Sequence, residues 1–200
     1  MPVKNKTVKM DAANKYIYFM KLDDEPKANK ARMIGLQGQT SGINNRQLQT
    51  LQTKMFDVKM AGSANQQRTV LAYFQTGDGL WDALKHAWKD QVTIHLYRVD
   101  FNQVSGTKPS RQAPVEYAQC IISTLPNTET LNSVFQLSVV FEVQGIAQDG
   151  VITEDQLEDD AFDLGNALYG MLKPTEAVSY THLTLPTTRS ECRSRWSPYH

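Results

Sequence analysis

The side chains able to act as a general acid or base are few and far apart in this sequence. His86 stands in a segment with helical spacing, and His95 alternates with apolar residues in an extended segment. A histidine works as a general base when a second group holds its proton or fixes its tautomer. We expect His86 on a helix surface without an acidic partner, and His95 on the exposed side of a strand. Neither histidine predicts a catalytic site.

The other chemically capable groups lead to the same expectation. Cys120 lies in an apolar run, where a buried small side chain is favoured over a reactive thiol. The carboxylates between residues 154 and 163 lack the glycine and glutamate spacing of a calcium loop, which favours a solvated helix face. Trp81 and Trp88 are spaced for core packing rather than for a stacking platform.

Sequence motifs for catalysis or cofactor binding are also missing. The chain contains no nucleophile elbow, phosphate-binding loop, dinucleotide fingerprint or zinc spacing. We therefore expect a protein that is not an enzyme and that uses no cofactor and no metal.

Length and composition favour one soluble domain. The chain has 200 residues, of which 40% are hydrophobic and 21% charged. No run approaches the roughly 18 apolar residues of a membrane span, and the basic first residues are not followed by an apolar stretch. These features predict a protein made and kept in the cytosol, with no membrane partner.

Residues 178–200 do not continue the pattern of the chain. Val178 to Thr187 reads codon by codon as a translated transposase-end sequencing adapter, GTC TCT TAT ACA CAT CTG ACG CTG CCG ACG. Cys192 to His200 reads in the same frame as the flow-cell end of that adapter, after a short variable index. We expect a non-native tail here, with the natural C-terminus beyond Glu176 missing. Without the tail, 18 basic and 20 acidic side chains remain, a balance that does not argue for a nucleic-acid-binding patch.

Strands dominate the remaining chain. Runs of aromatic and β-branched residues predict strands at Lys15–Leu22, Ala31–Leu36, Gln91–Val99, Val115–Ser123 and Ser133–Gly145. One helix is expected over Gly79–Lys89, capped by Asp78. Its apolar stripe would consist of Leu80, Trp81, Leu84 and Trp88.

A long β-hairpin is expected between the second strand and this helix. Arg46–Met60 would form one strand and Arg68–Gln75 the other, with a turn at Ala61–Asn65. The polar stretch Gln37–Asn45 reads as a loop before the hairpin. Much of one hairpin face would be polar.

The sum predicts a mostly β domain at residues 1–153, a β-sandwich or barrel with a flanking α-helix. An acidic C-terminal extension would follow at residues 154–177. Thr153–Gln156 resembles a capping box that opens a helix there. The apolar face of that helix would consist of Leu157, Ala161, Leu164 and Leu168.

Three stretches carry a family likeness. They are Val58–Ser63, the passage Phe74–Asp78 with Leu80–Lys89, and Pro126–Gly150 followed by Thr153–Gln156. In order and spacing, over roughly residues 14–157, the chain resembles the major tail (tail-tube) proteins of long flexible non-contractile bacteriophage tails.

The resemblance implies an assembling protein. Subunits would close into rings, usually hexameric, that stack into a tail tube through which double-stranded DNA is ejected. Further partners would be tape-measure and tail-end proteins, and the protein would be located in the virion tail after synthesis in the host bacterial cytoplasm. The hairpin would serve ring closure by edge-to-edge pairing between neighbours.

The residues expected at the assembly surface or in the lumen all lie on the hairpin. A lumen that conducts DNA should not bind phosphates through lysines and arginines. Lys54 and Lys59 are therefore expected to pair with carboxylates or to face a subunit boundary. The full candidate set is Gln49, Thr53, Lys54, Asp57, Lys59 and Arg68.

Two other classes stay open at this point. One is the inner-tube protein of a contractile injection or secretion system, which would share the fold. The other is a monomeric β-sandwich that binds cell surfaces, although the loop at residues 102–114 offers no aromatic side chain for that role.

Overall fold

One antiparallel sheet forms most of the domain in the computed structural model, which describes residues 11–74, 77, 79–126 and 135–163. The strands are β1 (Tyr16–Leu22), β2 (Arg32–Met33), β3 (Leu36–Gln52), β4 (Asp57–Tyr73), β5 (Ile94–Asp100), β6 (Gln112–Thr124), β7 (Gln136–Val143) and β8 (Gln148–Thr153). The helix α1 spans Leu80–Lys89, and 3-10 turns lie at η1 (Ala13–Lys15), η2 (Phe101–Gln103) and η3 (Glu154–Gln156). The prediction of a mostly β domain with one flanking helix and a long hairpin is confirmed.

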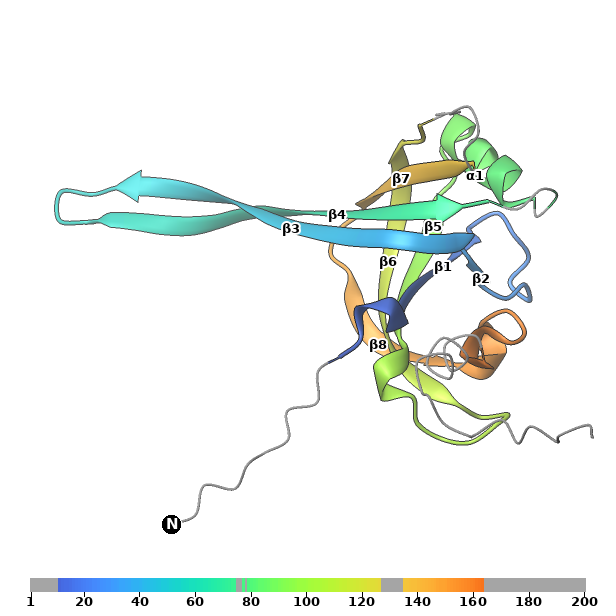
Figure 1. Ribbon diagram of the computed structural model, residues 1–200. Coiled ribbons are helices and arrows are strands. Elements are labelled where there is room, and N and C mark those ends of the chain that lie inside the picture. The colour runs from blue at the N-terminus through green and yellow to red at the C-terminus, as the bar shows by residue number, and fades with distance from the viewer. Residues whose placement is uncertain (1–10, 75–76, 78, 127–134, 164–200) are drawn as a thin grey trace, which may run out of the picture.

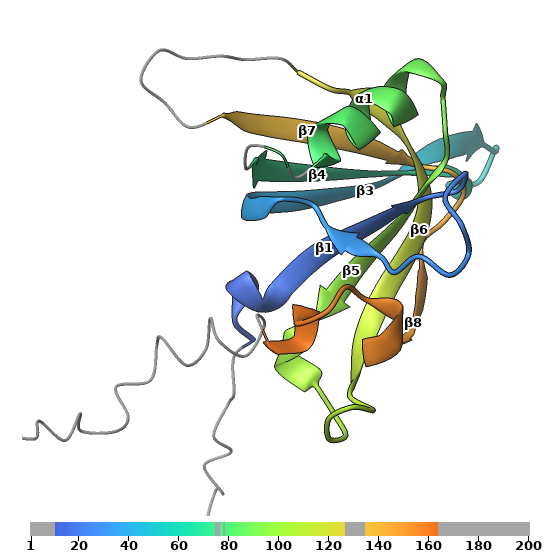
Figure 2. The same ribbon diagram turned by 90° about the vertical axis from the view of Figure 1, so that its right-hand side faces the viewer.

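The strand order is β2-β1-β5-β6-β7-β4-β3, with β8 as a branch that pairs with the first half of β6. The second half of β6 pairs with β7 instead. Figure 2 shows how the sheet curls, with α1 lying against one of its faces and the chain after β8 lying near the opposite end.

The two ends of the curled sheet approach each other where β3 begins. The side-chain amide of Gln37 accepts a hydrogen bond from the Tyr18 backbone N–H at 2.9 Å and donates one to the Tyr18 carbonyl. Gly35 is required at the approach, because its φ is +56° and a Cβ there would lie 2.7 Å from the Tyr73 carbonyl oxygen. The Gln37 side chain therefore links β3 to β1, which the strand ladder leaves unpaired.

The main core lies between α1 and the concave side of the sheet. Leu80, Leu84 and Ala87 of the helix are buried against it. From the strands, the core receives every second residue of β7, namely Leu137, Val139 and Phe141, as expected for a strand with one buried face. A second cluster on the other side of β1 and β5 contains Phe19, Phe101 and Phe162 in edge-to-face contact.

Phe141→Ala is expected to lower the free energy of unfolding by about 3–5 kcal/mol, because the ring is fully buried in the main core. Urea unfolding followed by circular dichroism measures this change. Val140→Ala, on the opposite face of the same strand, is the control and should cost less than about 1.5 kcal/mol. Equal losses in the two variants would contradict the assignment of the faces.

Two sequence predictions about the hairpin are wrong. Residues 37–45 are not a loop, and residues 61–65 are not the turn, because both lie inside the paired strands β3 and β4. The hairpin turns at Thr53–Phe56, where the Thr53 hydroxyl accepts a hydrogen bond from the Phe56 N–H at 3.1 Å. No residue from Leu36 to Gln66 is buried, so this part of the hairpin has no apolar alternation and its polar runs resemble loops. Strand β8 was not predicted either, because Ile152 is its one buried residue and a single buried position gives no alternation.

The predicted capping box at Thr153–Gln156 is confirmed, but it opens only the three residues of η3. Leu157 is extended and Asp160 has a φ of +67°, so the chain turns before residues 161–163 become helical. Leu164 and Leu168 lie outside the described residues. Within the part of the chain that the structure describes, no helix is long and apolar enough to cross a membrane.

Candidate assembly surface

The distal part of the β-hairpin extends beyond the body of the protein (Figure 1). Strand β4 pairs with β7 only from Gln67 to Tyr73, so β3 is its single neighbour farther out. We call residues 45–65 the hairpin arm. None of its residues is buried.

Apolar side chains are nevertheless common on the arm. The exposed large ones are Leu48, Leu51, Met55, Phe56 and Met60, and Met55 and Phe56 at the turn are 89% and 66% exposed. Exposed apolar side chains in such number are typical of interaction surfaces.

The register separates two faces of the arm. Gln49 lies opposite Met60 and Leu51 opposite Val58, so these four side chains share one face. The other face has Leu48 with Ala61, Thr50 with Lys59, and Gln52 with Asp57. The charged residues of the paired strands near the tip, Asp57 and Lys59, thus lie together and away from Gln49.

The first of these faces continues onto the convex side of the body sheet. In β4 the even-numbered residues Val70 and Ala72 point into the core, so the odd-numbered ones of this part point outward. The register shift between Arg46 and Leu48 adds one residue to β4, so beyond it the even-numbered residues of β4 take the outward side. We call the convex surface of β3, β4, β7 and β6 the outer face. It includes Ser41, Ile43, Gln67, Thr69, Gln136, Ser138, Val140, Glu142, Ile121 and Ser123.

The outer face is almost without charge. Of the residues just named, Glu142 alone is ionisable, and its carboxylate accepts a hydrogen bond from the Gln67 amide at 2.8 Å. A surface of this composition offers phosphate groups no cation to bind.

The predicted site residues are distributed unevenly over these surfaces. Gln49 lies on the arm face that continues into the outer face, whereas Asp57 and Lys59 lie on the opposite face. Thr53 and Lys54 lie in the turn at the arm tip. The hairpin register therefore separates residues that sequence alternation alone had grouped together.

Arg68, the remaining predicted site residue, lies inside the body rather than on the arm. Its side chain is 4% exposed and its guanidinium is paired with Glu116 inside the body. Since a buried side chain cannot line a channel, Arg68 does not belong with the exposed candidates.

Sequence reasoning missed the outer-face residues of β6 and β7. A signal was present, because Leu137, Val139 and Phe141 alternate with Gln136, Ser138 and Val140. What alternation could not show was that this polar side continues across β4 and β3 into the arm.

Both histidines have partners that the sequence analysis did not assign. His86 Nδ1 lies 2.7 Å from Asp90 and Nε2 lies 2.7 Å from Asp24, and these hydrogen bonds raise the pKa of His86. The expectation of a histidine without an acidic partner is therefore wrong. His95 contacts the Tyr117 hydroxyl at 2.6 Å and Asp23 at 3.0 Å, and its ring stacks on Tyr117. These contacts tie the turn after β1 to α1 and β5.

The other chemically capable groups are structural. Cys120 is fully buried, which confirms the prediction, and burial raises the pKa of its thiol to about 12. Trp81 packs edge-to-face on Phe135, as expected for core packing. Trp88 is 51% exposed, so the prediction that it packs in the core is wrong. Among the described residues, no group of three histidine, cysteine, aspartate or glutamate side chains could hold a metal ion.

The acidic segment is bound to basic side chains rather than freely solvated. Arg111, 8% exposed, donates to Glu154 and Asp163, and Lys108 also pairs with Asp163. The hydrogen bonds from Arg111 and then from Lys108 lower the pKa of Asp163 from 3.8 to about 2.

We expect Asp163 to titrate with a midpoint near pH 2 in a carboxyl-carbon NMR titration. Because its pKa is lower in the folded protein, its contribution to stability is present above pH 3.8 and is lost as the pH falls through about 2. Arg111→Met should move the midpoint up toward 3.8. A wild-type midpoint already near 3.8 would show that the pairing does not persist in solution.

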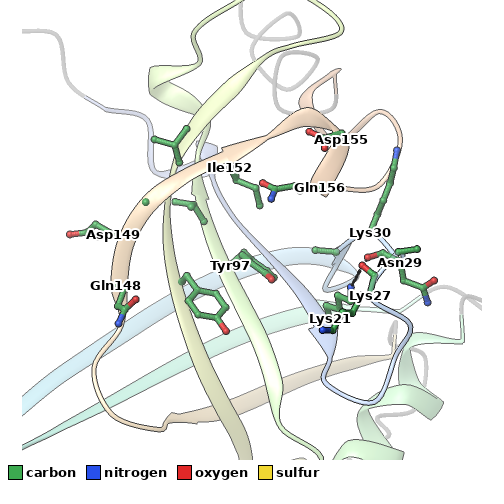
Figure 3. A pocket seen from close by; sticks show the side chains of 16 residues that line it. Lys21, Lys27, Asn29, Lys30, Tyr97, Gln148, Asp149, Ile152, Asp155 and Gln156 are labelled. Atoms are coloured by element: carbon green, nitrogen blue, oxygen red, sulfur yellow. Dashed lines mark hydrogen bonds between the residues drawn. The ribbon is translucent and has the colours of Figure 1, made fainter.

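A hollow of about 620 Å³ lies between β8 and the turn after β1 (Figure 3). Tyr97 and Tyr117 line it from the sheet, and Asp149 and Asp155 from the β8 side. The Lys21 ammonium donates to backbone carbonyls of the turn, at 2.9 Å each, and is thereby engaged. Lys27 and Lys30 also line the hollow.

This arrangement, a curled antiparallel sheet with one flanking helix and a long projecting hairpin, is the fold of phage tail-tube subunits. A subunit of the SPP1 tail tube, from a hybrid solid-state NMR and cryo-EM structure, superposes with a TM-score of 0.59 at 13% identity, over 70% of this chain and 79% of that one. The tail of an empty gene transfer agent particle matches with a TM-score of 0.54 at 11% identity, over 70% and 99% of the chains. A native gene transfer agent particle matches with a TM-score of 0.52 at 9% identity, over the same shares.

These likenesses establish the fold and leave the function to be argued from the chain itself. No protein-family model matches the sequence, and no curated protein sequence does.

Proposed function

We propose that this protein is the subunit of a tail tube, a structural protein that closes into hexameric rings, which stack into a conduit for DNA. The observation that carries the proposal is the hairpin arm, which has no buried residue and yet exposes five large apolar side chains. An isolated two-stranded hairpin is marginal in water, so an arm of this length calls for a partner.

Ring closure follows from the position of β3. This strand of 17 residues is the terminal strand of the sheet, so within the described residues one of its edges has no neighbouring strand. A long exposed edge invites pairing with another chain, and identical copies avoid open-ended aggregation when the contacts close into a ring. The arm then reaches the neighbouring subunit with its apolar side chains.

The outer face is the surface best suited to line the channel. It carries one carboxylate and no lysine or arginine, so it offers passing DNA no phosphate-binding group. Gln49 lies on the arm face continuous with it and stays a lumen candidate. Lys59 lies on the opposite arm face together with Asp57, which keeps its charge away from the channel.

The proposal also covers the partners of the tube and its location. The tube would contact a tape-measure protein in its lumen and tail-end proteins at its ends, and it would be part of a virion tail made in the host bacterial cytoplasm. The solved proteins that share the fold include tail-tube and gene transfer agent tail components.

We also propose that residues 178–200 are translated sequencing adapter. Resequencing the gene from its natural source tests this directly, because an adapter-derived tail would be replaced by another C-terminal sequence. Recovery of the same codons from unamplified DNA would disprove it.

Electron microscopy of the purified protein tests the tube proposal. We expect the full chain, or the chain ending at residue 177, to form rings or tubes in negative stain and to sediment far faster than a monomer. Monodisperse monomers at high concentration for both chains, or an assembled tube with the hairpin arm on its outside, would disprove it.

A further inference from the structure

The arm leaves the body at a sharply defined place. The ladder between β4 and β7 ends at the pair Gln67 and Glu142. One residue farther out, the Gln66 side-chain carbonyl accepts a hydrogen bond from the Ala147 N–H at 2.7 Å, and within the arm the two strands pair with each other. A two-stranded ribbon has little stiffness at such a point, so its direction depends on the contacts made just inside the body.

Arg68 makes several of those contacts. It follows Gln67 on β4, and its guanidinium reaches two other strands from a nearly fully buried position. Nε and Nη2 both donate to Glu116 of β6, Nε at 3.0 Å. Nη1 donates to the Asn44 side chain of β3 at 2.9 Å and to the Gln67 carbonyl at 3.0 Å.

The neighbouring residues leave room for this side chain and hold its partner. A Cβ on Gly42, the residue paired with Arg68 across the hairpin, would lie 3.2 Å from the Arg68 Cδ, so a larger side chain would crowd it. Glu116 is also approached by Arg98 at 3.6 Å, and the Arg98 guanidinium lies 4.2 Å from the centre of the Tyr16 ring. The carboxylate that receives Arg68 is thereby held in place from β5.

We infer that Arg68, through Glu116 and Asn44, sets the direction in which the arm leaves the body, and so positions it for the neighbouring copy. A buried ion pair adds little stability compared with well-packed apolar residues, but its directional bonds can select one geometry. Here the bonded strands are the arm's own two, β3 and β4, and the central strand β6. The role in positioning the arm for a neighbouring copy rests on the proposed tube function, whereas the role in setting the arm's direction does not.

The direct test measures arm direction in the unassembled protein. Spin labels at Lys54→Cys in the arm turn and Asp82→Cys on α1 report the distance between arm tip and body in the full chain carrying Cys120→Ala and Cys192→Ser. We expect a single narrow distance peak with Arg68 present. The double variant Arg68→Met/Glu116→Leu should lose this peak and give a broad distribution, while its thermal midpoint changes little.

A matched control and a milder variant keep the result interpretable. Arg111→Met/Glu154→Leu removes a similar pair at the start of β6 and the end of β8, with Arg111 8% and Arg68 4% exposed. This control should leave the narrow peak intact. Asn44→Ala breaks only the bond to β3 and leaves the core untouched, so it should broaden the peak even if the double variant fails to fold. A narrow peak retained in Asn44→Ala and in a folded double variant would overturn the inference.

Assembly of the same variants separates this inference from the tube proposal. Broadened peaks together with loss of rings in the Arg68 variant, and normal rings in the Arg111 variant, support both. Broadened peaks in a protein that never forms rings support the positioning role of Arg68 and reject the tube. An unchanged peak with normal rings rejects the positioning role and leaves the tube standing.

Discussion

A protein in which residues 46–64 are replaced by Asn-Gly is expected to stay folded and to form no rings or tubes. The dipeptide favours a tight turn between the paired residues Asn45 and Asn65, so the rest of the ladder can close. No residue of the deleted segment is buried, and the free energy of unfolding should therefore change by no more than about 1 kcal/mol. Sedimentation velocity and negative-stain microscopy measure the loss of assembly.

The control for this deletion is that the body, the part of the domain outside the arm, stays folded. Thermal unfolding and near-ultraviolet circular dichroism should match the full-length protein, because both core clusters lie outside the arm. Tubes formed by the folded deletion variant would show that the arm is not the assembly element. In that case the exposed apolar side chains of the arm would need another partner.

The second large effect is expected from cations placed on the outer face. Gln136→Lys/Ser138→Lys adds two lysines per subunit at exposed positions of β7, on the face proposed to line the channel. Repeated around each ring, they should convert an inert lumen into one that binds double-stranded DNA. If about six phosphates are contacted, the affinity should fall by about a thousandfold between 50 and 200 mM salt.

Co-sedimentation of tubes with short DNA duplexes over a salt series measures this binding. The charge-reversed control Gln136→Glu/Ser138→Glu alters the same positions and should bind no DNA at any salt concentration. Protection of the bound duplex from nuclease distinguishes lumen binding from binding to the outside of the tube. Lysine tubes whose bound DNA is fully digested would place β7 on the exterior and contradict the proposed lining.

The two predictions probe different surfaces of one sheet. The deletion tests whether the arm joins subunits, and the lysines test which face the joined subunits turn toward DNA. A folded subunit that assembles without the arm, or that carries β7 on the outside, would still have a tail-tube fold. Only the proposed use of that fold would then be wrong.

The amino-acid sequence by itself determined the elements that have a buried face. Val139 and Phe141 alternate with polar residues in β7, Leu80 and Leu84 follow helical spacing in α1, and Cys120 lies in an apolar run. Burial of apolar side chains imposes the period of the element on the sequence, so these segments were predictable. The capping box at Thr153 could also be predicted from the sequence, because its hydrogen bonds join residues within a few positions of each other.

The tertiary structure alone decided the features that depend on strands meeting across the chain. The turn at Thr53–Phe56, the separation of Gln49 from Lys59 and the burial of Arg68 all follow from the register of β3 against β4. An arm with neither face buried leaves no apolar period from which that register could be read. The carboxylates that pair with Arg68 and Arg111 are 48 and 43 residues away in the sequence. No sequence spacing predicts ion pairs over such separations. In this protein the elements of the body follow from local sequence pattern, whereas the candidate assembly surface depends on pairing between residues far apart in the sequence.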